Sequence, residues 1–231
     1  MSEITPAEWT AILLSLRVAI IATLVATPFG IALAWLLARY NFWGKSVLDA
    51  LVHLPLVLPP VVTGYLLLLT FGRCGLVGAW LADNLGIVFA FRWTGAALAC
   101  GVMSFPLLVR PIRLSIEAID RRLEQAASTL GAAPWRVFAT VTLPLALPGI
   151  LAGMVLGFAK AIGEFGATIT FVSNIPGETQ TISSAIYSLI QTPDGDTAAG
   201  RLVLISIVIA MSALIASEWF ARRATQRLHG N

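Results

Sequence analysis

The chain has 231 residues, of which 58% are hydrophobic and 12% are charged, and its formal net charge is +3. Because a soluble domain carries about 25% charged residues, this composition excludes a soluble protein and indicates a membrane protein with room for about five or six spans. The first ten residues contain no Lys or Arg, so we expect no cleavable signal peptide.

Five apolar stretches are long enough to cross a bilayer, for which about 20 residues suffice. They lie at residues 9–37, 51–71, 93–109, 143–172 and 202–220. Pro55, Pro59 and Pro60 open the second stretch, and Pro106 interrupts the third. Membrane helices tolerate such breaks where neighbouring helices or a cavity satisfy the freed carbonyl groups. The sequence therefore predicts an all-α polytopic bundle of five or six spans, forming one transmembrane domain over residues 9–220.

Lys and Arg are unevenly divided between the two sets of connections. Ten belong to the connections after the first and third stretches and to the basic tail at 221–231, namely Arg39, Lys45, Arg110, Arg113, Arg121, Arg122, Arg136, Arg222, Arg223 and Arg227. The other set holds three, Arg73, Arg92 and Arg201. Since cytoplasmic loops carry the excess of positive charge, we expect a periplasmic N-terminus and a cytoplasmic C-terminus. On the outer side, 76–91 and 181–191 are predicted to form short helices. The pattern of 181–191 suits a helix lying at the membrane interface, or one that presents a surface to an external partner.

Arg17, Lys160 and Glu164 are ionisable residues that fall well inside the predicted spans. Arg17 lies about two turns into the first one, where its long stem would let the guanidinium snorkel to the headgroups. Lys160 and Glu164 are four residues apart, so we expect them on one helix face and paired. Such a pair could hold the span or gate the pathway, and Lys160 could instead contact an anion directly. A pathway lined by bare positive charge would hold an oxyanion too tightly, which favours the structural or gating role.

A short polar element, residues 123–144, interrupts the apolar pattern on the predicted cytoplasmic side. Gly131 is a natural helix stop, and Pro134 can open a second short helix that carries Trp135 and Phe138. This predicts a helix–turn–helix bracket with two exposed aromatic residues, and an exposed apolar patch typically marks a protein interface. The alternative is a loop that only links two spans. Residues 123–144 are called the bracket below.

The bracket resembles the coupling-loop motif of permeases of importer-type ABC transporters, E-A-A-x3-G-x9-I-x-L-P. Five positions match, Ala126, Ala127, Gly131, Leu143 and Pro144, while Val141 replaces Ile and Gln125 replaces Glu, with Glu124 just before it. The resemblance implies a type I importer permease fold whose coupling loop inserts into a groove of an ATP-hydrolysing subunit. The implied coupling residues are Glu124, Gln125, Ala126, Ala127, Gly131, Trp135, Phe138, Leu143 and Pro144.

Residues 158–168 and 174–187 resemble the molybdate permeases of bacterial ABC importers, and sulfate permeases carry a similar Gly-Glu-aromatic-Gly block. This resemblance implies import of a tetrahedral oxyanion, most closely molybdate, across the bacterial inner membrane by alternating access, with sulfate or tungstate as alternatives. It also implies a homodimeric pore, two ABC ATPase subunits and a periplasmic oxyanion-binding protein. The candidate pathway or gating residues are Lys160, Gly163, Glu164, Phe165, Gly166 and Thr168.

Other function classes find little support in the sequence. Cys74, Cys100 and the two histidines show no metal-ligand spacing, and we expect no cofactor and no nucleic-acid partner. Paired acids, histidine clusters and an activated nucleophile are missing, so an embedded enzyme is not expected. The chain also lacks the G-x-x-x-x-G-K-[ST] motif, which places ATP hydrolysis on a partner. A self-sufficient channel or secondary transporter would need an internal repeat or more polar residues at mid-membrane.

Overall fold

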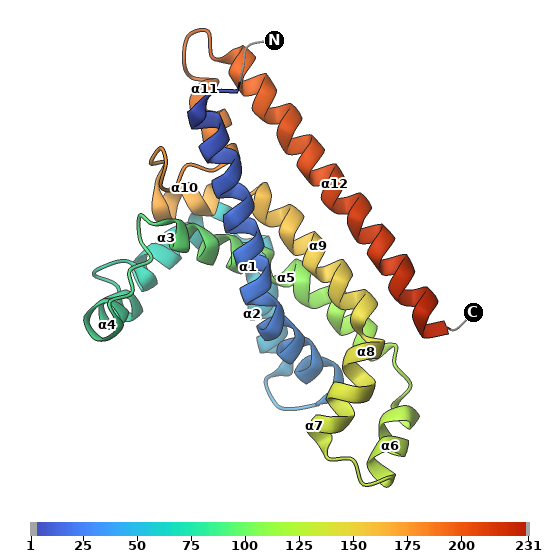
Figure 1. Cartoon of the computed structure of the whole chain (residues 1–231). Coiled ribbons are helices and arrows are strands. Elements are labelled where there is room, and N and C mark those ends of the chain that lie inside the picture. The colour runs from blue at the N-terminus through green and yellow to red at the C-terminus, as the bar shows by residue number, and fades with distance from the viewer. Residues whose placement is uncertain (1–3, 230–231) are drawn as a thin grey trace.

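The computed structural model describes residues 4–229, with side chains as far as Ala216, and the regular structure of these residues is helical. Figure 1 shows the helices in chain order. They are α1 (Pro6–Arg39), α2 (Lys45–Val57), α3 (Pro60–Phe71), α4 (Leu76–Leu85), α5 (Trp93–Glu117), α6 (Arg121–Thr129), α7 (Pro134–Val137), the π-helical turn η1 (Phe138–Thr142), α8 (Leu143–Leu145), α9 (Leu147–Ile162), α10 (Gly166–Val172), α11 (Ile182–Leu189) and α12 (Asp196–His229). The side chains of the predicted basic tail, 221–231, lie outside the described residues.

Three of the described helices, α1, α5 and α12, are long and apolar enough to cross a membrane. Two bent pairs bring the number of spans to five if each pair counts as one span: α2 with α3, bent by 114°, and residues 134–145 with α9, bent by 68°. The predicted all-α bundle of about five spans is confirmed. The predicted continuous span over 143–172 is wrong, because α9 ends at Ile162 and α10 begins separately at Gly166. Helix α5 runs unbroken through Pro106, so the predicted interruption of the third stretch is wrong, and it continues past the predicted end at residue 109, to Glu117.

The core lies where α5 packs between α1 and α9 (Figure 1). Leu108 and Ile112 of α5 are fully buried there. Lipid tails are as apolar as the helix surfaces, so close packing rather than water exclusion holds membrane helices together, and small residues permit it. Gly149 and Gly153 of α9 serve this purpose, because a Cβ on Gly153 would lie 2.6 Å from the Leu108 carbonyl oxygen.

The two short helices α3 and α10 also pack closely against each other. A Cβ on Gly64 of α3 would lie 2.5 Å from the Ala167 carbonyl oxygen, and one on Gly166 of α10 would lie 2.7 Å from Pro60 Cβ. Each helix follows a break in a predicted span. The breaks therefore meet, and the segments that leave the two broken spans form one packed unit.

The N-terminal ends of α1 and α12 are joined by polar contacts. Thr5 and Glu8 form a capping box at the start of α1, and the Glu8 carboxylate also pairs with Arg201 of α12 at 2.8 Å. The Ile182 N–H of α11 donates to the Ser15 hydroxyl of α1 at 2.7 Å. The predicted short helices are confirmed as α4 and α11. Helix α11 packs its apolar side, with Ile182 buried, against α1 and α12. Its placement at the membrane interface stays a prediction.

The α5–α9 contact generates a stability prediction. Gly153→Ala forces a methyl group against the Leu108 carbonyl, and we expect it to cost about 1–3 kcal/mol through overpacking, seen as a lower thermal unfolding midpoint of the detergent-solubilised protein. Gly157→Ala on the same helix is the matched control, because its Cβ would lie 3.6 Å from the nearest atom, in ordinary contact. Equal midpoints for the two variants would contradict the glycine-mediated packing.

Candidate coupling bracket and broken-helix site

The bracket stands at the end of the molecule opposite the N-terminus, with α6 and α7 projecting beyond the bundle (Figure 1). Asp120 caps α6 by accepting a hydrogen bond from the Arg122 N–H at 2.9 Å. Gly131 turns the chain with φ of +86°, a left-handed conformation that favours glycine, and Pro134 occupies the first turn of α7. The predicted helix–turn–helix geometry is thus confirmed.

Large apolar side chains are exposed on the bracket. The exposed fractions are 50% for Leu123, 88% for Leu130 and 67% for Trp135. Phe138 is only partly buried from solvent but packs edge-on against Trp35 of α1, with ring centroids 5.3 Å apart. The expectation of two exposed aromatic residues is therefore right for Trp135 and wrong for Phe138, which fastens the bracket to the bundle.

Glu124 turns towards the bundle. Its carboxylate pairs with the guanidinium of Arg39 at the end of α1, 3.0 Å away, and accepts a hydrogen bond from the Thr142 hydroxyl at 2.6 Å. The Arg39 and Glu124 side chains are only 9% and 18% exposed. In this geometry Glu124 positions the bracket. A docking partner would contact the exposed residues around Glu124 before it reached Glu124 itself. We call Glu124, Arg39 and Thr142 the Glu124 network.

The remaining motif residues divide between an outer and an inner face. Gln125, Ala126 and Pro144 are exposed, whereas Ala127 is half-buried. Leu143 is half-buried and lines, with Trp35, a groove of about 610 Å³ between the bracket and α1. Leu123, Leu130 and the Glu124 partners were missed by sequence reasoning. The position of Leu130, an apolar residue directly before the Gly131 turn, was a signal that could have predicted its exposure. No sequence signal connects Arg39 with Glu124.

The second candidate site is the break between α9 and α10. Lys160 Nζ and Glu164 Oε2 lie 2.7 Å apart, so the predicted pair forms. Glu164 lies beyond the end of α9, not on the same helix face as Lys160, because the helix ends at Ile162. Its second oxygen, Oε1, accepts a hydrogen bond from the Ala167 N–H of α10 at 3.0 Å, and the side chain is 1% exposed. One carboxylate thus connects both halves of the broken helix.

The other predicted pathway residues surround this carboxylate. Phe165 packs against Tyr187 of α11 with ring centroids 4.9 Å apart. Thr168 is buried, and its hydroxyl donates to the Phe165 carbonyl at 2.9 Å. The Ile162 carbonyl, freed where α9 ends, accepts a hydrogen bond from Ser183 of α11 at 3.3 Å. Gly166 approaches α3, as described above, whereas Gly163 is exposed. Among the described residues no group of His, Cys, Asp or Glu could hold a metal ion.

Solved permease structures share this fold. A bacterial ABC transporter involved in the import of the acidic polysaccharide alginate matches with a TM-score of 0.74 and 21% identity over 96% of this chain and 81% of that chain. The MetNI methionine ABC transporter in an inward-facing conformation matches with a TM-score of 0.68 and 15% identity over 98% of this chain and 100% of that chain. The fold is therefore that of a type I ABC importer permease.

Relatives of similar sequence are named as transport permeases. The molybdenum transport system permease protein ModB of Escherichia coli K12 is 62% identical over 97% of this chain and 98% of its own length, and that of Haemophilus influenzae is 58% identical over 96% of both. A probable sulfate transport system permease protein of Chlorokybus atmophyticus is 38% identical over 86% of this chain and 70% of its own length. Residues 26–227 match the family model, and the chain belongs to the family of binding-protein-dependent transport system inner membrane components.

Proposed function

We propose that the chain is the membrane-spanning permease subunit of an ATP-driven importer that carries molybdate from the periplasm to the cytoplasm. The observation that carries this function is the bracket, a helix–turn–helix at one end of a type I permease bundle with Leu123, Leu130 and Trp135 exposed. Identity of 62% to a molybdenum permease over nearly the whole length supports the substrate. Sulfate transport is favoured less, since the sulfate relative is 38% identical.

The proposed assembly is a homodimer of this chain with two ABC ATPase subunits on the bracket side and an oxyanion-binding protein on the other. The N-terminus is periplasmic and the C-terminus cytoplasmic, as the Lys and Arg distribution supports. ATP binding would draw the ATPases together and displace the docked brackets. ATP hydrolysis takes place on the ATPase subunits, and this chain converts their motion into alternating access.

A continuous path of contacts supports this conversion. The Glu124 network holds the bracket to α1, and the backbone runs from the bracket through α8 into α9. At the far end of α9, Lys160 pairs with Glu164, which accepts a hydrogen bond from α10. Helix α10 in turn packs on α3. A tilt of α9 would therefore move α10 and α3 together, so we assign Lys160, Gly163, Glu164, Phe165, Gly166 and Thr168 to a gate.

The function is tested in proteoliposomes that contain the permease, its ATPase and the binding protein. We expect ATP-dependent uptake of labelled molybdate that excess tungstate competes away and equimolar sulfate does not. Uptake that persists without the ATPase would indicate a self-sufficient channel or secondary transporter. Preferential sulfate uptake would move the chain to the sulfate branch.

Coupling is predicted to depend on the turn at Gly131. Gly131→Val places a β-branched side chain at φ of +86°, which is a strained conformation for valine, so the turn should rearrange. ATPase co-purification and molybdate uptake should then both fall at least about ten-fold, as for loss of an interface hot spot. Gly44→Val is the matched control, with φ of +91° and equally open surroundings in the α1–α2 turn, outside the bracket. We expect Gln125→Glu to have a smaller effect, and the opposite ranking would contradict the proposed docking.

The Lys160–Glu164 pair is predicted to act through structure and gating. Lys160→Met leaves the buried Glu164 carboxylate without its cation, which for a buried pair costs about 3–5 kcal/mol, and uptake should fall strongly. The double variant Lys160→Met with Glu164→Gln removes both charges and keeps an oxygen acceptor for the Ala167 N–H, so uptake should recover substantially. A double variant as inactive as Lys160→Met, although folded and bound to the ATPase, would instead indicate direct anion contact by Lys160.

A further inference from the structure

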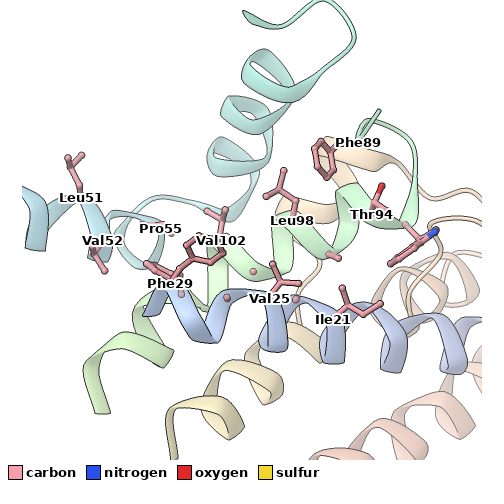
Figure 2. A pocket seen from close by; sticks show the side chains of 16 residues that line it. Ile21, Val25, Phe29, Leu51, Val52, Pro55, Phe89, Thr94, Leu98 and Val102 are labelled. Carbon is pink, nitrogen blue, oxygen red and sulfur yellow. The ribbon is translucent and has the colours of Figure 1, made fainter. Parts of the chain in front are cut away.

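An apolar groove follows the seam between α1 and α5, apart from both sites described above. Its volume is about 690 Å³. Figure 2 shows Ile21, Val25 and Phe29 on the α1 side and Leu98 and Val102 on the α5 side, with α2 bordering the end near Phe29. Nearly all its lining is hydrocarbon, so the groove offers an oxyanion almost no hydrogen-bond donors and fits an apolar occupant.

A cation stands at the other end of this groove. Arg17 lies one helical turn before Ile21 on α1, and its guanidinium carbon is 3.8 Å from the ring centroid of Trp93, which lines the groove. Stacking of this kind is an attractive cation–π contact that fixes the guanidinium plane. Among the described side chains Arg17 has no carboxylate partner. Its donors are therefore available to an anionic group outside the chain.

The surface around Arg17 is apolar and exposed. Leu13 and Ile20, on the same side of α1, are 50% and 46% exposed, and α1 is a candidate membrane span. An arginine on such a surface is costly unless its guanidinium reaches the headgroup region. The phosphate of a lipid is the anion present at that level, and an arginine–phosphate contact is a strong charge-assisted hydrogen bond.

We propose that this groove is a phospholipid site, with one acyl chain along α1 and α5 and the lipid phosphate bound by Arg17. The dimensions agree, because the helix rises about 18 Å from Arg17 to Phe29, close to the depth of about 15 Å for one leaflet. Phosphate at one end and hydrocarbon along the rest match the charge and the lining of the groove. A lipid seated there would fill the seam that α2 leaves open between α1 and α5.

The test is native mass spectrometry of the full-length permease, purified in mild detergent with its bound subunits. We expect wild type to retain one phospholipid per permease chain. Arg17→Gln removes the charged donors, and occupancy should fall about ten-fold, whereas Arg17→Lys should restore part of it. Arg73→Gln, an exposed arginine in the α3–α4 turn, is the matched control and should retain the lipid.

A second variant tests the acyl-chain half of the site. Val102→Trp fills the groove without altering Arg17, and it should also release the lipid while the thermal unfolding midpoint shows that the protein is folded. Full lipid occupancy in either Arg17→Gln or Val102→Trp, or no retained lipid in wild type, overturns the proposal. So does displacement of the lipid by excess molybdate, which would make Arg17 an oxyanion ligand. A further outcome would overturn the lipid proposal as well. If Val25→Cys, in a Cys74→Ser background, forms a disulfide between two permease chains, the groove is occupied by a second copy of the chain.

Discussion

Close packing of α9 against α5 is the contact on which both candidate sites depend. In a bilayer the helices gain little from burying apolar surface against each other, so van der Waals contact at short range must hold them. Gly149 and Gly153 allow this approach, and a methyl group on either would meet atoms of α5. Helix α9 carries the bracket at one end and the Lys160–Glu164 break at the other. Its position on α5 therefore sets the relation between the surface that meets a partner and the region proposed as the gate.

The two ends of α9 use charge in the same way. Glu124 and Glu164 are both well shielded, and each accepts hydrogen bonds or ion pairs from two separate segments. A shielded carboxylate is stable only when its oxygens are satisfied by partners, so each one holds those segments in place. The residues that a partner would touch first are apolar ones, Leu130 and Trp135. Positioning and contact are thus carried by different residues of the bracket.

The proposed lipid site concerns a third surface. The exposed side of α1 is apolar around Arg17, and the groove beside it ends at the ring on which Arg17 stacks. This arrangement gives a function to an arginine that neither the bracket nor the broken helix uses. A lipid bound there would add the surrounding membrane to the contacts that hold α1, α2 and α5 in their arrangement.

Local signals were sufficient to predict much of this protein. Apolar length predicted the helical bundle, and Gly131 with Pro134 predicted the bracket, because φ preferences and missing donors act within a few residues. Proline positions were a weaker guide, since α5 runs unbroken through Pro106. The break after Ile162 and the burial of Phe138 were missed. The break has no proline. Its freed Ile162 carbonyl is satisfied by Ser183 of α11, and Gly166 packs on Pro60 of α3, so both contacts come from other segments. Phe138 is turned inward by Trp35, about a hundred residues earlier in the chain. Such contacts exist only once distant helices pack together, so the tertiary structure alone decided where α9 ends and which bracket residues remain exposed.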